Sequence, residues 1–174
     1  HVGVDSFLAK PLFASNVIDE FEHIARKNNL QISRENNRAD LEGKHILLAE
    51  DIMINAEIMK ELLAAHGMEV DHAENGRIAL DMFEQSDEHY YDTILMDVRM
   101  PEMDGLEATE EIRKQDHADA KTIPIIAMTA NAFDEDVQRS LQAGMNAHLS
   151  KPVDPDILYR TLGELIWECE HNRI

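Results

Sequence analysis

The stretch that most constrains this chain runs from Ile94 to Pro101, where apolar residues lead directly into a carboxylate. Three apolar residues precede Asp97, and a Met-Pro pair follows shortly after it. Proline cannot donate to a strand ladder, and the pair Asp104-Gly105 then favours a turn. A buried strand that ends on an aspartate presents it at the carboxyl edge of a sheet, where open α/β sheets bind ligands. Asp97 is therefore the first candidate for a functional residue.

Short apolar runs alternate with helical patterns from residue 45 onward. The runs expected to form strands are residues 45–49, 68–73, 93–97, 123–128 and 146–149. The helical patterns cover residues 54–66, 134–143 and 154–167, with two more around residues 78–83 and 106–112. The apolar runs lack polar alternation, which is typical of strands buried on both faces. Five strands alternating with five helices predict an α/β fold with a parallel sheet covered on both faces through right-handed crossovers.

Polar side chains stand at the carboxyl ends of four of these expected strands. The first strand is followed by Glu50 and Asp51, the third ends at Asp97, the fourth is followed by Thr129, and the fifth by Lys151. A parallel sheet brings these ends to one edge. Three carboxylates repel one another without a cation, and Mg²⁺ takes one or two carboxylates while keeping several waters. With an ammonium and a hydroxyl to contact oxyanions, the set predicts Mg²⁺-assisted phosphoryl transfer onto Asp97.

Residues 44 to about 167 resemble a receiver domain of the two-component response regulator family. The matching features are Glu50-Asp51, Asp97, Met100-Pro101, Asp104-Gly105, Thr129-Ala130 and Lys151-Pro152. The resemblance implies a flavodoxin-like, doubly wound sheet of five parallel strands in the order 2-1-3-4-5 with helices on both faces. It also implies that Asp97 is the phosphoacceptor. Glu50, Asp51 and Asp97 would hold Mg²⁺ together with the backbone carbonyl of Arg99.

The same resemblance assigns roles to residues after the fourth and fifth strands. Thr129 and Lys151 would contact the phosphoryl oxygens, and the Lys151–Pro152 peptide would be cis. Glu50 departs from the pattern because many members have a second Asp there. His148 stands where the family's switch position usually carries Tyr or Phe. It acts either as an unusual switch residue together with Thr129 or simply as a surface residue, and both interpretations remain open.

A short internal repeat suggests how the chain is organised. Residues 3–12 share Gly, Leu, Lys and Pro with residues 144–153 at matching positions, and a helical pattern follows each copy. The predicted organisation is a C-terminal strand and helix remnant of a preceding receiver-like domain (1–27), a linker (28–43), the receiver domain (44–168) and a C-terminal tail (169–174).

Charge and composition limit the partners and the cellular compartment that we expect for this chain. The net charge of −19 repels nucleic acid phosphates, so no nucleic acid partner is expected. The single cysteine, Cys169, cannot form an internal disulfide and fits a reducing compartment. No apolar run reaches the length of about 18 residues that a membrane span needs.

Residues 127–132 and 144–153 resemble receivers fused to hybrid sensor histidine kinases. That resemblance implies a phosphorelay receiver, with Mg²⁺-dependent autophosphorylation and autodephosphorylation, in the cytoplasmic part of a membrane-bound bacterial kinase. Its partners would be a histidine kinase domain, which donates to Asp97, and a histidine phosphotransfer domain, which receives the group. A homodimer through the face between the fourth and fifth helices, or through the N-terminal helix, is also compatible with the family.

Two alternatives come from other functional classes. A receiver-like docking module that is never phosphorylated would not need the intact set of Glu50, Asp51, Asp97, Thr129 and Lys151. A phosphatase with an aspartyl nucleophile carries a second acid two residues after the nucleophile, and this chain has Arg99 there. The residues therefore favour the phosphorelay receiver.

Overall fold

The computed structural model describes residues 39–131 and 134–172, so the predicted remnant of a preceding domain, residues 1–27, lies outside the described residues. The elements follow in the order β1 (His45–Ala49), α2 (Met53–Ala64), β2 (Glu69–Ala73), α3 (Gly76–Glu84), β3 (Thr93–Asp97), α4 (Gly105–Lys114), β4 (Ile125–Thr129), α5 (Asp134–Ala143), β5 (Ala147–Ser150) and α6 (Pro155–Asn172). All strand pairs are parallel, in the order β2-β1-β3-β4-β5. The predicted fold class is confirmed.

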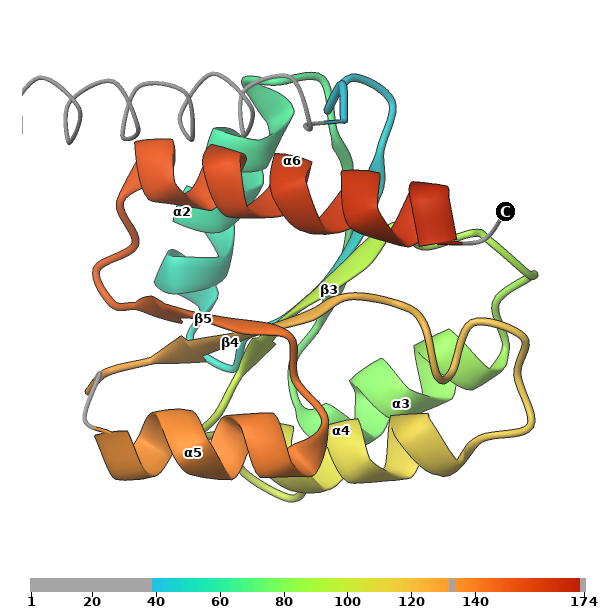
Figure 1. Ribbon diagram of the computed structural model, residues 1–174. Coiled ribbons are helices and arrows are strands. Elements are labelled where there is room, and N and C mark those ends of the chain that lie inside the picture. Colours follow the sequence, from blue (N-terminus) through green and yellow to red (C-terminus); the bar gives the residue numbers. More distant parts are fainter. Residues whose placement is uncertain (1–38, 132–133, 173–174) are drawn as a thin grey trace, which may run out of the picture. The chain divides into compact units, whose positions relative to one another are not determined.

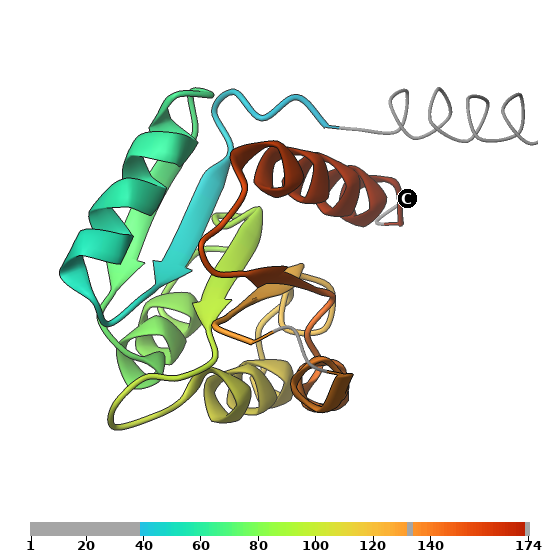
Figure 2. The same cartoon turned by 90° about the vertical axis from the view of Figure 1, so that its left-hand side faces the viewer.

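The central strands are buried on both faces, as their continuous apolar sequences predict. Successive residues of β1 point to opposite sides, so Ile46 packs with α2 and α6 while Leu47 packs with α3 and α4. Leu95 and Ile94 of β3 divide in the same way. Figures 1 and 2 show α2 and α6 on one face of the sheet and α3, α4 and α5 on the other. These two apolar layers hold the strand ends in register.

Several element boundaries differ from the sequence prediction by up to five residues, most notably at β4 and α6. β4 begins at Ile125, after Pro124, because proline has no backbone N–H. The Pro124 carbonyl instead accepts hydrogen bonds from the Ile94 amide at 2.9 Å and the Thr93 hydroxyl at 2.8 Å. α6 continues to Asn172, so residues 169–172, predicted as a tail, are helical.

The last residues of the predicted linker pack against the domain. The Ala39 amide donates to the Gly163 carbonyl of α6 at 3.0 Å, and Leu41 packs with the apolar layer of α2 and α6. The Gly43 amide donates to the Gly67 carbonyl at 2.9 Å. The Lys44 ammonium forms an ion pair with Glu170 near the end of α6. The packed domain therefore begins at least five residues before the predicted boundary, at Ala39.

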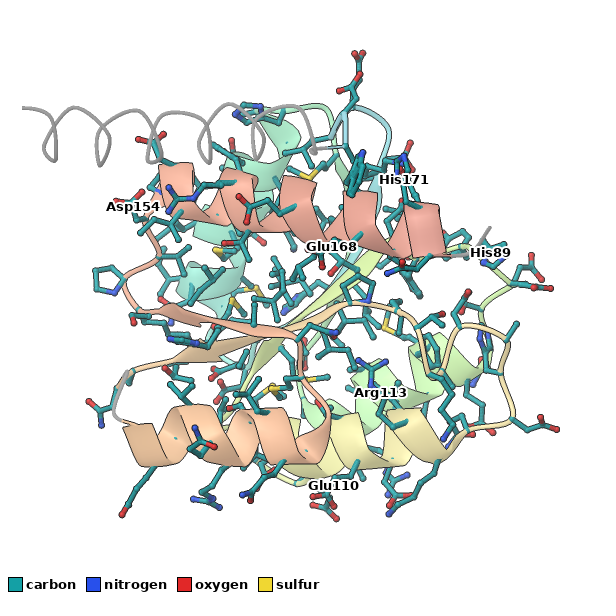
Figure 3. The ribbon with its side chains drawn as sticks, viewed as in Figure 1. His89, Glu110, Arg113, Asp154, Glu168 and His171 are labelled. Carbon is teal, nitrogen blue, oxygen red and sulfur yellow. The ribbon has the colours of Figure 1, made fainter. Side chains whose placement is uncertain are left out.

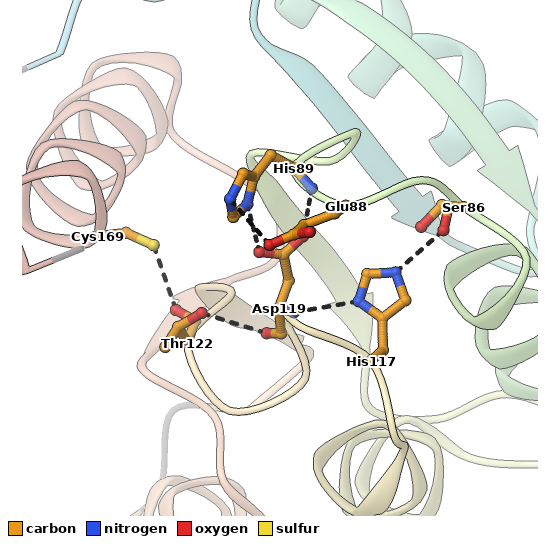
Figure 4. A network of polar contacts seen from close by, with 7 residues as sticks. All are labelled: Ser86, Glu88, His89, His117, Asp119, Thr122 and Cys169. Atoms are coloured by element: carbon orange, nitrogen blue, oxygen red, sulfur yellow. Dashed lines mark hydrogen bonds and ion pairs between the residues drawn. The ribbon is translucent and has the colours of Figure 1, made fainter.

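A polar network joins the loops before β3 and β4 to the end of α6 (Figure 4). It lies at the amino ends of these strands, opposite the carboxyl ends where the predicted site residues stand. The buried Asp119 carboxylate accepts from both the backbone amide and the ring Nδ1 of His89, each at 2.6 Å. These bonds hold His89 in its left-handed conformation, φ 62°. The His117 Nδ1 accepts from the Asp119 amide, so its Nε2 donates to the Ser86 carbonyl at 3.0 Å.

Arg113 of α4 also holds loops in place through hydrogen bonds, and Figure 3 shows it on the face of the sheet that α4 covers. Its guanidinium donates to the Gly144 carbonyl at 2.9 and 3.0 Å and to the Ala120 carbonyl at 2.9 Å. Burial lowers the pKa of Arg113 from its usual value, and carbonyl oxygens compensate for the lost hydration. Arg113 thereby fixes the turn that leads into β5.

None of the helices within residues 39–131 and 134–172 has the length and apolar character needed to cross a membrane.

Gly105 is the position where the fold tolerates a side chain least. A Cβ there would lie 2.1 Å from the Asp97 carbonyl oxygen, which is a backbone atom held in β3. We expect Gly105→Ala to lower the free energy of unfolding by about 2–3 kcal/mol despite the better helix propensity of alanine. Urea denaturation measures this change. Glu110→Ala, at an exposed site of the same helix, is the control and should change stability by less than about 0.5 kcal/mol; equal stability of the two variants would contradict the packing argument.

Candidate phosphoryl-transfer site

The structure brings three predicted carboxylates together at the carboxyl edge of the sheet. Glu50 and Asp51 follow β1, and Asp97 is the last residue of β3. One carboxylate oxygen from each of these residues lies within 4.8 Å of the others. Glu50 and Asp97 are buried, with 1% and 5% of their surface exposed, whereas Asp51 is exposed. One of the three acids is therefore accessible to solvent, and the other two are buried at the carboxyl edge of the sheet.

Lys151 bridges the two buried carboxylates. Its Nζ donates to Glu50 Oε2 at 2.7 Å and to Asp97 Oδ2 at 2.8 Å. The Lys151 backbone amide donates to the Thr129 carbonyl at 2.7 Å, and the following Lys151–Pro152 peptide is cis, as predicted. One ammonium therefore compensates part of the charge of two acids that burial would otherwise disfavour.

Burial shifts the titration of Asp97. It raises the pKa of Asp97 to about 6, against the opposing hydrogen bond and charge of Lys151, and the nearby Glu50 charge raises it further. For Lys151, burial alone would lower the pKa, but hydrogen bonds to Asp97 and Glu50 outweigh it and raise the pKa above its usual value. Lys151 therefore stays charged, and the negative charge at Asp97 is the costly one.

Thr129 lies beside Asp97 and Lys151 on the wall of a hollow of about 240 Å³. Thr129 is buried, and its hydroxyl donates to the Asn131 carbonyl at 2.9 Å. The Arg99 amide donates to Asp97 Oδ1 at 3.2 Å, so the loop after β3 wraps around the carboxylate. The hollow thus contains Asp97 together with an ammonium, a hydroxyl and a backbone amide.

His148 lies outside this hollow. It is exposed on β5, a strand at the edge of the sheet, opposite Ala127 of β4. Both interpretations of His148 accommodate this position, so its role as a switch residue stays a prediction. The metal-ligand role of the Arg99 carbonyl likewise stays a prediction.

Sequence reasoning missed an apolar surface beside the hollow. Ile52, Met53, Ile54 and Ile58 are between 49% and 66% exposed at the start of α2. Ile58 also lines a second hollow of about 390 Å³, whose other lining residues include the apolar Met59, Leu62, Met128 and Val153 as well as Asn55 and Lys151. Three consecutive apolar residues at 52–54 cannot all face the core of a helical segment. That pattern was the available signal for this surface.

The donor set fits a hard divalent cation. Carboxylate oxygens are the ligands that Mg²⁺ uses in proteins, and the exposed Asp51 leaves room for the waters that Mg²⁺ retains. The cluster is also the one group of at least three potential metal-ligating side chains that lie together within the described residues.

The raised pKa of Asp97 predicts a pH-dependent cost to stability when divalent metal is absent. Between the ordinary carboxyl pKa of 3.8 and the folded value of about 6, the native state binds more protons than the unfolded state. The wild-type chain should therefore lose about 1–1.5 kcal/mol of unfolding free energy relative to Asp97→Asn as pH rises from 5 to 7.5. Urea denaturation in EDTA at several pH values measures this difference. A difference that stays constant or changes in the opposite direction would contradict the assignment.

Comparison with known proteins agrees with this geometry. Residues 46–162 match the model of the response regulator receiver domain family. The chain is 38% identical over 131 residues to hybrid signal transduction histidine kinase I of Dictyostelium discoideum, and the match covers 74% of this chain but only 8% of that relative.

Solved receiver domains have the same fold. The receiver domain of a sensor histidine kinase from Pseudomonas aeruginosa PAO1, which has a magnesium ion in its active-site cleft, is 41% identical with a TM-score of 0.65. That match covers 71% of this chain and 98% of the bacterial one. A co-crystal structure of the Saccharomyces cerevisiae histidine phosphotransfer protein Ypd1 with the receiver domain of Ssk1 matches with 27% identity and a TM-score of 0.62, over 70% of this chain and 87% of that one. This chain belongs to the response regulator receiver domain family.

Proposed function

We propose that this chain is the phosphoacceptor of a phosphorelay, taking a phosphoryl group onto Asp97 and passing it to a histidine phosphotransfer domain. The observation that carries the proposal is the position of Asp97. It ends a buried strand, beside two further carboxylates and in hydrogen-bond contact with Lys151. The carboxylate proposed to attack phosphorus therefore lies beside a positive charge and two further carboxylates before any donor arrives.

The side chains of this site divide the chemistry among them. Glu50, Asp51, Asp97 and the Arg99 carbonyl would hold Mg²⁺, which when bound neutralises charge on the phosphoryl oxygens. An Asp97 oxygen forms the new bond to phosphorus while the bond from phosphorus to the donor's imidazole nitrogen breaks. The electron pair of that broken bond stays with the imidazole. Lys151 and Thr129 contact the phosphoryl oxygens, so their charge is met by an ammonium and a hydroxyl donor.

Phosphorylation also changes the hydrogen bonding of Thr129. Its hydroxyl donates to the Asn131 carbonyl in the unphosphorylated chain, so contact with a phosphoryl oxygen requires that bond to be exchanged. This exchange moves the loop after β4 and repacks the surface around α5, β5 and the start of α6. His148 lies on this surface and is proposed to move with it.

The apolar surface at the start of α2 supports a protein donor and acceptor. Of its four exposed side chains, Ile52 lines the hollow that contains Asp97 and Ile58 lines the apolar hollow that shares Asn55 and Lys151 with it. An apolar helix face that presents a histidine would cover them while placing its imidazole at the hollow. The Ypd1 complex shows that a similar receiver domain forms a complex with a histidine phosphotransfer protein. We therefore assign this surface to a histidine phosphotransfer domain.

The wider setting is part of the same proposal, and relatives that are histidine kinases support its kinase context. The parent protein is a hybrid sensor histidine kinase, with this receiver in the cytoplasmic part of a membrane-bound chain. We assign residues 1–27 to the end of a preceding receiver-like domain and residues 28–38 to the linker. Dimerisation through the face between α5 and α6, or through the N-terminal segment, would serve regulation. Relatives from a slime mould and a bacterium are compatible with this setting.

Intact mass after incubation with acetyl phosphate and Mg²⁺ tests the phosphoacceptor role. We expect a gain of one phosphoryl group that disappears in EDTA and in Asp97→Asn, because the variant lacks the nucleophilic oxygen. Lys151→Arg is expected to slow the reaction at least about tenfold, since a guanidinium cannot replace a point-like ammonium between two carboxylates. The absence of any adduct, even with a histidine kinase domain and ATP present, would favour the unphosphorylated docking module.

Ile54→Glu tests the docking surface. Ile54 is 66% exposed, so the change should not affect folding. It places a charge where we expect an apolar helix to pack, and it should lower the rate of phosphoryl exchange with Ypd1 at least about tenfold. Leu141→Glu, a matched change at a 49% exposed residue of α5, is the control. Equal effects of both variants would argue against docking at α2.

A further inference from the structure

Asn55 occupies a position that none of the roles above explains. It lies in the first turn of α2 and lines both hollows of the site, the polar one that contains Asp97 and the apolar one beneath α2. Lys151 is the other residue that the two hollows share. A histidine-bearing helix that covers the apolar surface must therefore bring its imidazole past Asn55 to reach Asp97.

The Asn55 side chain is available for a ligand. It is only partly exposed, yet its amide makes no hydrogen bond with any other described residue, in contrast to Lys151, which already contacts two carboxylates. Because the residue is partly exposed, water can satisfy the amide in the free chain, and the N–H of a bound ligand can replace that water. The amide is also neutral, so it adds no repulsion for an anionic phosphoryl group beside Asp51, Asp97 and Asp136, which line the same hollow.

The chemistry of the transfer provides a partner for this amide. The donor reacts in its imidazolium form, in which one ring nitrogen carries the phosphoryl group and the other carries a proton. Transfer breaks the bond between phosphorus and the first nitrogen, the electron pair of that bond stays on this nitrogen, and the ring leaves as neutral imidazole with its N–H on the other nitrogen. That N–H needs a hydrogen-bond acceptor. An amide oxygen accepts such a bond without adding a further negative charge beside the phosphoryl group, which a carboxylate would add.

We propose that the side-chain oxygen of Asn55 accepts a hydrogen bond from the imidazole N–H of the phosphohistidine donor and, in the reverse direction, of the acceptor histidine. This inference rests on the proposed phosphoacceptor function and deepens it. Asn55 then distinguishes a phosphoryl group carried on imidazole from one carried on an acyl group, which has no N–H. Under this proposal, Asn55 contacts the phosphohistidine substrate directly.

Two small donors separate this role from a general effect on the site. The full chain is phosphorylated with phosphoimidazole and with acetyl phosphate in Mg²⁺, and intact mass gives the two rates. For Asn55→Ala we expect the ratio of the phosphoimidazole rate to the acetyl phosphate rate to fall about tenfold, as the loss of one hydrogen bond to the leaving group implies. Asn55→Ser, which keeps a short acceptor, should restore part of that ratio.

Asn131→Ala is the matched control because Asn131 lines the polar hollow but not the apolar one. It should leave the ratio within about twofold of the wild-type value, whatever it does to both rates together. An unchanged ratio in Asn55→Ala, or an equal fall in Asn131→Ala, would overturn the role of Asn55 and leave the phosphoacceptor function standing. A wild-type chain that reacts with acetyl phosphate but not phosphoimidazole would also overturn it. Failure with both donors would instead overturn the proposed function.

Discussion

The interaction on which the site depends is the contact of one ammonium with two buried carboxylates. Lys151 Nζ lies 2.7 Å from Glu50 and 2.8 Å from Asp97, and both acids are almost inaccessible to water. Without that cation, two adjacent buried charges would repel each other and lose their hydration. Glu50 is one methylene longer than the aspartate common in the family. Its length does not prevent an ion pair with Lys151, while another of its oxygens accepts from the Ile52 amide at 3.1 Å.

The apolar layers on both faces of the sheet make this contact possible. Strands β1, β3 and β4 are completely apolar in their interiors, so they can lie at the centre of the sheet and end at one common edge. Close backbone approach fixes the loops at that edge, most tightly at Gly105, which leaves no space for a Cβ beside Asp97. The polar network around Asp119 and the contacts of Arg113 hold the opposite edge. The loops of the site therefore extend from strands whose two ends are both fixed by close packing or hydrogen bonds.

The carboxyl edge of the sheet carries two different surfaces, an acidic one and an apolar one. The acidic cluster offers carboxylate ligands that suit a divalent cation, and the residues Ile52, Met53, Ile54 and Ile58 expose an apolar surface that suits a protein partner. Asn55 lies at the boundary of the two regions and adds a neutral hydrogen-bonding group there. Selectivity for a histidine-borne phosphoryl group would then arise where the two surfaces meet, rather than from the carboxylates alone.

The sequence by itself determined the order of strands and helices and the residues at the strand ends, because both depend on local periodicity. Asp97 as the end of a buried strand, and Glu50, Asp51, Thr129 and Lys151 at neighbouring ends, could be predicted before any coordinates. The resemblance to receiver domains added the strand order. Only the tertiary structure decided that Lys151 contacts residues 101 and 54 positions away, that His148 is exposed, and that the start of α2 presents apolar side chains beside Asn55. Periodicity describes which face of an element is apolar, whereas the packing of distant elements decides which of those faces remains uncovered.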